Sequence, residues 1–392
     1  MVDLSGRIYS LCDYYLGTKA DTGGEESIIM EKKIMNKNTK RDFSLDFLKA
    51  SAIFLVCQTH YMHYKDNGLN NFVAIASCMG VPLFFMVNGA LLMNRPLDTE
   101  RHYKKTLRIF VLCIVWKIIS VILMSFIWKK NILENGIAVL LNFVMGRNDL
   151  QGYELGHFWY LYALVGIYTI FPLFKICYDN EKGKIIIKYI LGIIAFFSIG
   201  ISTLNLFVQI FAYIRGRETE LSFNWLNSYY IFGMYGYCIF WFILGGILYS
   251  EVKQVKQPKK MKDISFLLFA IGWLLLFLLN RFQNITGTSP FIVVDGYYCV
   301  PTVMMCVGIF IISKLLLGNR QNNMIMTISR ETWGIYMLHI IVGTAFLKVQ
   351  GRYYFECGIL LNFIKSVWMI AASLVVIWIM KKIPVVKKLV VF

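Results

Sequence analysis

The side chains that could do chemistry in this chain are the ionisable groups that occur inside its long apolar segments. Such groups are costly in hydrocarbon, so those that occur there usually serve a function. Aspartate and glutamate are missing from the middle of these segments, and carboxylates are the usual relays of ion-coupled transporters. The absence of carboxylates there therefore weighs against an ion-coupled transporter. The ionisable residues inside the apolar segments are His60, His63, Arg108, Lys117, His339 and Lys365.

His60 is the strongest catalytic candidate. It follows Lys49 by eleven residues, which in an α-helix gives a rise of roughly 16 Å and three turns plus about 20°, so both side chains share one face. We expect Lys49 at the cytoplasmic surface and His60 near the middle of the membrane, an arrangement that suits a ligand with an anionic head and a thin arm. Histidine can act as a general base near neutral pH. The structural alternative is that His60 only forms a hydrogen bond to a neighbouring helix.

A metal site is not expected. His63 lies one turn beyond His60, and an H-x-x-H pair without carboxylates or cysteines is a weak metal signal. The nine cysteines form no C-x-x-C pair, so we interpret them as small buried hydrophobic residues. We place His63 at the outer interface.

Three further segments have both a functional and a structural interpretation. The basic stretch RHYKKTLR (101–108) could neutralise phosphates or could only hold its loop in the cytoplasm. His157 begins the run HFWYLY, which also suits an aromatic belt at the lipid headgroups. The loops 215–230 and 281–298 mix charged residues with tryptophan and tyrosines. Such surfaces can bind sugars by stacking and hydrogen bonds, but they also suit any hydrated loop.

The elements that must position these residues are transmembrane helices. The chain is 57% hydrophobic and 16% charged, with a mean hydropathy of +0.58, whereas soluble domains are about 25% charged. Its apolar residues fall in continuous runs of about 20, the length of a membrane-spanning helix. The positive-inside rule explains the net charge of +17 better than a nucleic-acid partner does. We therefore expect the lipid bilayer as a partner and no nucleic acid.

The sequence predicts an all-α polytopic integral membrane protein with about ten transmembrane helices. We expect a polar N-terminal tail at 1–40 and one membrane domain at 41–392. The stretch 131–145 is expected to lie at the interface or to re-enter. The predicted helices lie near 46–64, 72–93, 107–127, 157–175, 185–208, 229–250, 264–280, 296–317, 333–348 and 358–380.

The charge of the connections predicts the orientation. Lysine and arginine are dense in alternate connections and sparse in the others, and the positive-inside rule places the dense ones in the cytoplasm. With an even number of crossings, both termini are then cytoplasmic. The dense connections are 95–105, 175–188, 253–262, 314–330 and 381–388.

Five segments of the chain match the motifs of a known family. They are RDFSLDFLKASAIFLVCQTH (41–60), GVPLFFMVNGALL (80–92), KKTLRIF (104–110), HFWYLYALVGIYTIFPLF (157–174) and WGIYMLHIIV (333–342). On these segments the chain resembles, from residue 41 to about 385, the acyltransferase-3 family of membrane O-acyltransferases. Lys49 and His60 match the family's Arg/Lys-x10-His motif. The family usually has Ser where Asn88 stands and Arg where Lys49 and Lys105 stand, and lysine keeps the charge but loses the bidentate fork.

The resemblance implies transfer of an acyl group, commonly acetyl, from cytoplasmic acyl-CoA to a hydroxyl on the outer side. The implied acceptor is a cell-envelope glycan or a lipid-linked saccharide. His60 would be the catalytic residue, as a base or as an acyl carrier, and Lys49, Lys105 and Arg108 would bind the CoA phosphates. The implied setting is a bacterial plasma membrane, and a homodimer is left open. Acceptor-binding or supporting roles are implied for Asn88, His157, Trp159 and His339.

Two other classes of protein remain as alternatives. One is a glycolipid or small-molecule transporter without enzymatic activity, which the missing intramembrane carboxylates disfavour. The other is a receptor or scaffold, which the dense cytoplasmic and intramembrane basic residues disfavour. Binding or hydrolysis of acyl-CoA by the purified protein would separate an acyltransferase from both.

Overall fold

The computed structural model of the chain describes residues 41–61, 68–146, 150, 153, 155–217, 219–286, 293–349 and 358–391. The regular elements of these residues are all helical, which confirms the all-α class. The chain divides into two units, residues 1–42 and 43–392, and every element below belongs to the second. The tail predicted at 1–40 lies outside the described residues.

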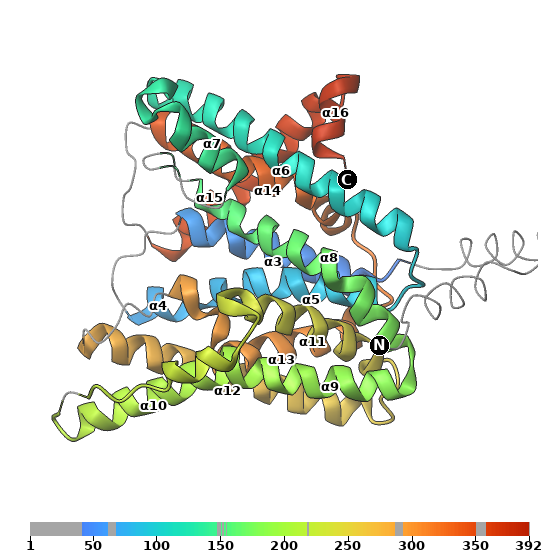
Figure 1. Cartoon of the computed structure of the whole chain (residues 1–392), viewed down its shortest axis with the longest axis vertical. Helices are drawn as coiled ribbons and strands as arrows, with labels where there is room; N and C mark the ends of the chain where they lie inside the picture. Colours follow the sequence, from blue (N-terminus) through green and yellow to red (C-terminus); the bar gives the residue numbers. More distant parts are fainter. Residues whose placement is uncertain are drawn as a thin grey trace, which may run out of the picture. The chain divides into compact units, whose positions relative to one another are not determined.

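The helices are connected as Figure 1 shows. The α-helices are α3 Phe43–Tyr61, α4 Gly68–Ala74, α5 Gly80–Met93, α6 Thr99–Trp128, α7 Ile137–Met145, α8 Trp159–Asp179, α9 Glu181–Ala195, α10 Ile201–Ile214, α11 Gly236–Val252, α12 Pro258–Thr286, α13 Val300–Leu317, α14 Asn323–Val349, α15 Ile359–Met380 and α16 Pro384–Val390. The short 3-10 helices are η1 Ile75–Met79, η2 Ile132–Asn135, η3 Gly156–Phe158, η5 Asn224–Tyr229, η6 Gly233–Tyr235 and η7 Val293–Tyr298, and η4 Phe196–Gly200 is a π-helix.

Eight segments of the described chain are long and apolar enough to cross a membrane, which confirms a polytopic membrane protein. They contain α4–α5, α6, α8, α9–α10, α12, α13, α14 and α15. The other two predicted crossings correspond to α11 and α3. Helix α11 is apolar but has only 17 residues, and α3 carries Asp46, Lys49 and His60 within its 19 residues. The two predicted crossings that fall outside the eight segments are therefore a short helix, α11, and a polar helix, α3.

Two predicted helices are interrupted in the structure. The helix predicted at 72–93 contains the 3-10 segment η1, which ends just before α5. Pro82 stands at the start of α5, where it lacks an N–H and its ring would clash with the carbonyl four residues earlier in a continuous helix. The helix predicted at 185–208 begins at Glu181 and contains the π-helix η4. A π-helix inside a longer helix is often found at a functional site.

The stretch predicted at the interface, 131–145, contains the short helix α7. Its nine residues are too few to span a bilayer, which needs about 20. Lys117 of α6 is fully buried and donates hydrogen bonds to the carbonyls of Phe143 and Gly146 at the end of α7. The Tyr162 hydroxyl donates to the same Gly146 carbonyl at 2.7 Å. Lysine side chains can bind the last carbonyls of a helix, which have no partner within the helix. Lys117 and Tyr162 thus fix the end of α7 against α6 and α8.

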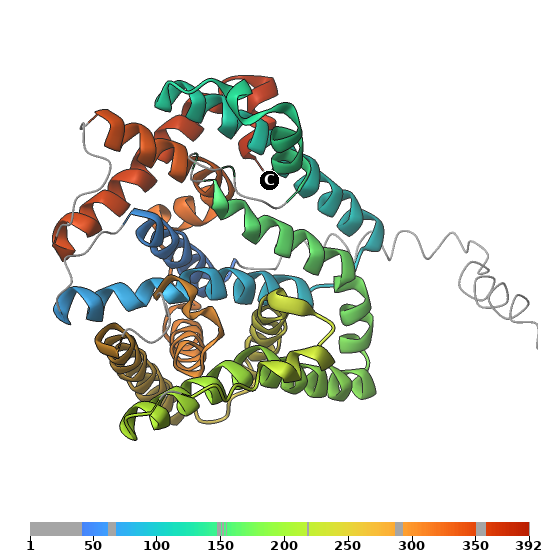
Figure 2. The same ribbon diagram turned by 60° about the vertical axis from the view of Figure 1, so that its left-hand side comes forward.

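Helix α3 is the centre of the packing around His60. It contacts α5, α13, α14 and α15, and Figure 2 shows these helices around it. Behind it, α5 and α11 approach backbone to backbone. A Cβ on Gly89 would lie 1.8 Å from the Phe242 carbonyl oxygen, and one on Gly245 would lie 2.2 Å from that of Met86. Small residues at the crossing therefore permit the close contact of these two helices.

Successive connections alternate between the two ends of the helix bundle (Figure 1). The basic connections around 94–98, 253–257 and 318–322 lie at the end where α3 begins. The placement of this end in the cytoplasm remains a prediction from the charges.

Candidate functional site

Three histidines from separate parts of the chain meet at one place. His60 lies in the last turn of α3, His157 in η3, and His339 within α14. The ring centroids are 5.3 Å apart for His60 and His339, 5.3 Å for His157 and His339, and 6.3 Å for His60 and His157. We call these residues the histidine cluster. The sequence marked each of them separately, and the structure brings them together.

The hydrogen bonds of the cluster leave several ring nitrogens without partners. Nδ1 of His339 lies 2.6 Å from the Tyr336 carbonyl oxygen, and a carbonyl can only accept, so this nitrogen carries a proton. Within the described chain, Nε2 of His339 and both ring nitrogens of His157 are buried without a partner. A buried polar atom without a partner costs roughly 1–3 kcal/mol. A catalytic role is one recognised reason for tolerating that cost.

Tyr336 joins the cluster to the start of α8. Its hydroxyl donates to the His157 carbonyl oxygen at 2.5 Å, and its ring lies 5.5 Å from that of His339. The sequence analysis missed this residue. The signal was present, because Tyr336 precedes His339 by three positions in a predicted helix and such pairs share a face.

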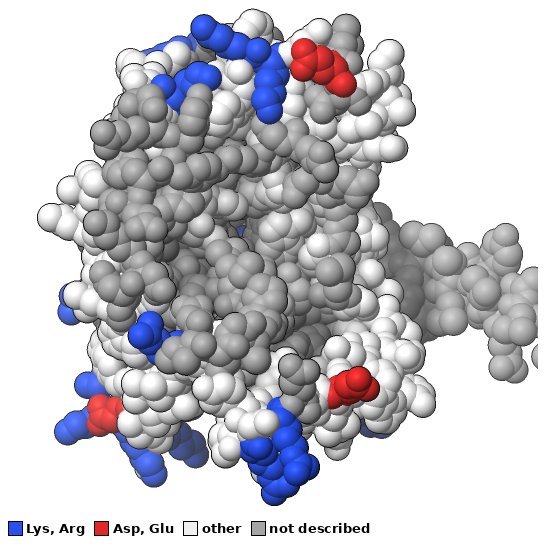
Figure 3. Space-filling view, turned by 90° about the vertical axis from the view of Figure 1, so that its left-hand side faces the viewer, with Lys and Arg blue, Asp and Glu red and all other residues white. Residues whose placement is uncertain are grey.

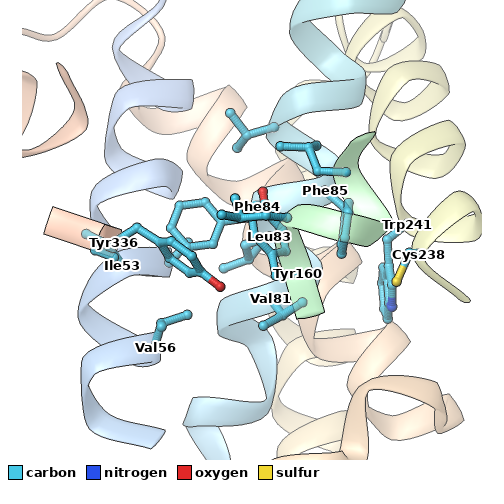
Figure 4. Close-up of a cluster of buried hydrophobic side chains, with 14 of the residues drawn as sticks. Ile53, Val56, Val81, Leu83, Phe84, Phe85, Tyr160, Cys238, Trp241 and Tyr336 are labelled. Atoms are coloured by element: carbon cyan, nitrogen blue, oxygen red, sulfur yellow. The ribbon is translucent and has the colours of Figure 1, made fainter. Parts of the chain in front are cut away.

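A cavity of about 820 Å³ opens beside the cluster, and His60 and His157 line it. It lies toward the end of the bundle where α3 ends and α11 and α13 begin. Four of its buried lining residues are Val56, Val81, Tyr160 and Tyr336, which come from α3, α5, α8 and α14 and are drawn in Figure 4.

One wall of the cavity is a group of aromatic rings. Trp159 stacks on Tyr235 with centroids 5.7 Å apart and planes at 29°. Tyr297 lies 6.0 Å from Trp159 at 31° and 6.2 Å from Tyr237 at 26°. Tyr237 is tilted against the other two rings, by 55° to Trp159 at 6.3 Å and by 38° to Tyr235 at 6.2 Å, so the four rings form a compact cluster. Trp159, predicted as an acceptor or support residue, lies within this wall.

Another part of the lining includes Phe197 and Ser198 of the π-helix η4. Phe197 stacks on Tyr230 with centroids 5.2 Å apart and planes at 10°, and the Ser198 hydroxyl lies 2.9 Å from that of Tyr230. Burial raises the pKa of the Tyr230 hydroxyl, so this group stays neutral near pH 7. A π-helix turns these side chains into the cavity, and nothing in the sequence pattern predicted it.

The described lining contains no aspartate, glutamate, lysine or arginine. Apart from the two histidines, its polar side-chain groups are tyrosine, serine and threonine hydroxyls, the Asn227 amide and the Trp159 indole N–H. The remaining lining residues are Thr59, Gly156, Ser202, Asn227, Gly233 and Tyr298.

Asn88 lies one layer behind the cavity. Its amide nitrogen donates to the Phe84 carbonyl at 2.8 Å and contacts the Tyr160 hydroxyl at 3.3 Å, and its amide oxygen accepts from the Tyr168 hydroxyl at 2.8 Å. Asn88 thus ties α5 to α8 and holds Tyr160, which lines the cavity. This position suits a supporting role.

The predicted phosphate ligands lie on two helices. Lys105 and Arg108 are exposed on α6, and Arg95, Arg101 and Arg108 are close enough to repel the charge of Lys105. Lys49 lies half-buried on α3. The structure thus places Lys105 and Arg108 in one basic group, with Lys49 on a different helix.

Arg108 has a second set of partners that the sequence did not predict. Its guanidinium donates to the carbonyl of Val391 at 2.7 Å and to that of Lys388 at 3.5 Å. The indole nitrogens of Trp116 and Trp333 both donate to the Leu389 carbonyl. Side chains of α6 and α14 thus hold the end of α16, and Arg108 is one of its anchors.

In the described part of the chain, no group of three or more histidine, cysteine, aspartate or glutamate residues is arranged to hold a metal ion. His63 lies outside the described residues, so its predicted place at the outer interface stays a prediction.

Comparison with known proteins gives one finding. A family model described as an acyltransferase domain matches residues 42–382, a range that runs from α3 through α15 and includes the histidine cluster and the cavity. No curated protein and no solved structure matches the chain.

Proposed function

The chain belongs to the acyltransferase-3 family and is a multi-pass membrane acyltransferase, and from this premise we propose that it O-acylates a saccharide of the cell envelope. The donor is cytoplasmic acyl-CoA, with acetyl as the expected acyl group. The acceptor is a saccharide hydroxyl in the cavity beside the histidine cluster. The expected setting is a bacterial plasma membrane.

The observation that carries this proposal is the position of His60. It lines the cavity, lies within 5.3 Å of His339 by ring centroids, and stands roughly 16 Å along α3 from Lys49 by the helical rise. One side chain can therefore meet an acceptor in the cavity and the reactive end of a long donor that enters along α3.

The chemistry needs a base and a path for one proton. An unprotonated ring nitrogen of His60 takes the proton of the acceptor hydroxyl, and the hydroxyl oxygen attacks the thioester carbonyl of acyl-CoA. An O-acyl ester forms, the C–S bond breaks, and the proton leaves with CoA as its thiol. In a covalent route the acyl group first moves to His60 and then to the hydroxyl, with the same overall balance.

His339 and His157 act in this proposal as positioning residues. The proton on Nδ1 of His339 is fixed by the Tyr336 carbonyl, so the neutral ring keeps its Nε2 lone pair free to accept from a neighbouring N–H. His157 is held through its own carbonyl by the Tyr336 hydroxyl. Asn88 supports the site from behind through Tyr160.

The donor side of the proposal uses the basic residues at the other end of the bundle. Lys49, Lys105 and Arg108 neutralise the CoA phosphates, and the pantetheine arm extends toward His60. Lysine contributes a point charge, whereas the arginine fork can bind two phosphate oxygens together. Arg108 can do so only if it exchanges its bonds with the end of α16.

The proposal is tested with the full chain purified into lipid nanodiscs. Acetyl-CoA is added and release of the free CoA thiol is measured, while O-acetyl content of the surface glycan is compared with and without the gene. Thiol release that depends on His60, together with gene-dependent O-acetylation, is the expected result. A protein that neither binds nor hydrolyses acetyl-CoA but moves a glycolipid across the bilayer would support the transporter alternative instead.

A further inference from the structure

We infer that Tyr160 is a further catalytic residue, whose hydroxyl donates a hydrogen bond to the carbonyl oxygen of the acyl thioester. This inference rests on the proposed function, because it assigns a second group to the same reaction. Tyr160 is only 6% exposed and lines the cavity together with His60. Its ring lies 5.3 Å from that of Tyr336 (Figure 4). The Tyr336 ring in turn contacts those of His157 and His339.

The bonds of Asn88 fix the direction of its hydrogen bond to Tyr160. The Asn88 amide nitrogen lies 2.8 Å from the Phe84 carbonyl oxygen, and the amide oxygen lies 2.8 Å from the Tyr168 hydroxyl. A carbonyl can only accept a hydrogen bond, and an amide nitrogen can only donate one. The amide nitrogen must therefore face Phe84, and at 3.3 Å it donates to the Tyr160 hydroxyl oxygen. The O–H proton of Tyr160 is left for another acceptor.

The two tyrosines nearest to this network have already used their protons. Tyr168 donates to the Asn88 amide oxygen, and Tyr336 donates to the His157 carbonyl oxygen. Within the part of the chain that the structure describes, the Tyr160 hydroxyl has no hydrogen-bond partner besides Asn88. A buried donor without an acceptor is destabilising, and a catalytic role is one recognised reason for tolerating it. The site thus holds an O–H donor that is free to bind an oxygen of a ligand.

The Tyr160 hydroxyl is directed toward the end of the bundle from which the donor is proposed to enter. The cavity lies toward the other end, viewed in Figure 3, where the described Lys and Arg side chains lie around the edge. Asn88 stands roughly 12 Å along α5 from Gly80, by the helical rise, in the direction of the donor end. Since the Tyr160 hydroxyl contacts Asn88, a thioester that extends along α3 meets this hydroxyl on its way to His60.

A hydrogen bond from Tyr160 stabilises the charge that develops during the transfer. When the acceptor hydroxyl attacks the thioester carbonyl carbon, its proton goes to His60 and the carbonyl oxygen becomes negative. The Tyr160 O–H donates to that oxygen and keeps its own proton. The carbonyl re-forms as the C–S bond breaks, and the ester and the CoA thiol are the products. A preorganised donor of this kind typically contributes about 10²–10³-fold to kcat.

The first test removes single hydroxyls from the full chain in lipid nanodiscs. Tyr160→Phe should lower kcat for release of the CoA thiol by roughly 10²–10³-fold, while the Kd for acetyl-CoA stays unchanged. Tyr168→Phe is the matched control, because it removes a hydroxyl on the same helix that bonds the same amide but has no proton left for a ligand. It should lower kcat by only about 2- to 13-fold, the value of one ordinary hydrogen bond.

The second test detects the hydrogen bond without any turnover. The probe is acetonyl-dethio-CoA with an isotope label at its carbonyl carbon, an analogue in which a methylene replaces the thioester sulfur, so that the acyl group cannot be transferred. A hydrogen bond lowers the stretching frequency of a carbonyl. We expect the infrared band of the bound probe at a lower frequency in the unmodified chain than in Tyr160→Phe. Replacement of Tyr160 by meta-fluorotyrosine, which keeps the ring and is a stronger donor, should lower the frequency further.

The outcomes separate this inference from the proposed function. Unchanged kcat in Tyr160→Phe, an equal or larger loss in Tyr168→Phe, or a carbonyl band that ignores both replacements of Tyr160 would overturn the inference. A chain that shows the Tyr160-dependent band but releases no CoA thiol keeps the hydrogen bond and loses the acyl transfer. A chain that releases thiol equally well in Tyr160→Phe keeps the acyl transfer and loses this inference. A chain that does not bind the probe loses both.

Discussion

The imidazole rings of His60 and His339 lie with their centroids 5.3 Å apart, although the two residues come from the first and the penultimate long helices of the described chain. This contact depends on the packing of α14 against α3. The His339 ring, whose Nδ1 is hydrogen-bonded to the Tyr336 carbonyl, therefore lies beside His60, the proposed base.

The first prediction follows for His339. His339→Ala removes the ring that packs 5.3 Å from that of His60 and orients it, and a contact between rings is worth about 0.5–1.5 kcal/mol, or roughly 2- to 13-fold in rate. We expect kcat to fall while KM for acetyl-CoA stays unchanged, measured by thiol release. Partial recovery in His339→Gln, whose amide can also accept a hydrogen bond, would support positioning. A change confined to KM would argue against it.

The second prediction concerns the donor phosphates. Lys105→Ala should lower the affinity for acetyl-CoA by roughly 10- to 150-fold, because charge-assisted hydrogen bonds contribute about 1.5–3 kcal/mol. Binding should also weaken as salt screens the charges. The measurement is calorimetric titration at two ionic strengths. Lys104→Ala is the matched control, since Lys104 is exposed and already paired with Glu100. Equal effects of the two substitutions would remove the specific role of Lys105.

Arg108 gives a prediction with two readouts. Its bonds to the carbonyls of Val391 and Lys388 mean that Arg108→Ala should loosen α16 as well as weaken donor binding. Faster amide hydrogen exchange over 384–391 would report the first effect and calorimetry the second. Loosening of α16 without any loss of affinity would make Arg108 a structural anchor only.

The sequence predicted the helices well because apolar runs of fixed length are a direct consequence of the bilayer. It also singled out His60, His157 and His339, since ionisable and aromatic residues stand out in such runs. It could not predict that they meet, because helix packing is set by contacts such as Gly89 against α11, not by the pattern of one segment.

Other features of the site left no readable signal. The π-helix that turns Phe197 and Ser198 into the cavity has the same apolar composition as an ordinary helix. Arg108 has the expected position, but its bond to the chain end depends on how α16 folds back. The tyrosines of the loops were noted as a surface that could bind sugars, and only the structure selects Tyr230 and Tyr297 for the cavity.

A stability prediction tests the crossing of α5 and α11. Gly245→Ala would place a Cβ 2.2 Å from the Met86 carbonyl oxygen. Such overpacking typically destabilises a protein by about 1–3 kcal/mol or more. We expect a lower apparent Tm in detergent. Gly192→Ala on α9 is the control, because no atom lies within 4 Å of the added Cβ and alanine favours the helix by about 0.5–1 kcal/mol. A Gly245→Ala protein as stable as the unmodified chain would contradict the close crossing.

The orientation is tested by labelling single cysteines in intact cells on a background without the native cysteines. We expect residues 94–106 and 251–263 to be protected from an impermeant thiol reagent and residues 215–228 to react, since basic connections stay in the cytoplasm. Reaction in the 251–263 connection would invert the topology and place the cavity on the cytoplasmic side.

The last prediction concerns His60 itself, on which the proposed mechanism depends. His60→Ala should abolish detectable acyl transfer, because a general base typically contributes about 10²–10⁴-fold to the rate and a covalent carrier contributes more. Membrane insertion should be unaffected, since removal of a polar group does not hinder it. Binding of acetyl-CoA should also persist, because the proposed phosphate ligand Lys49 stands roughly 16 Å away along α3.

His63→Ala is the matched control, because His63 is predicted from the sequence to lie at the outer interface, and its effect should be milder. The measurement is the O-acetyl content of the surface glycan in a deletion strain complemented with each variant at equal expression. Rapid quenching with radiolabelled acetyl-CoA adds a second readout, since label retained on the unmodified chain and absent from His60→Ala would identify the covalent route. Near-normal acetylation with His60→Ala would remove His60 from the chemistry, and His157 would then be the next residue of the cluster to substitute.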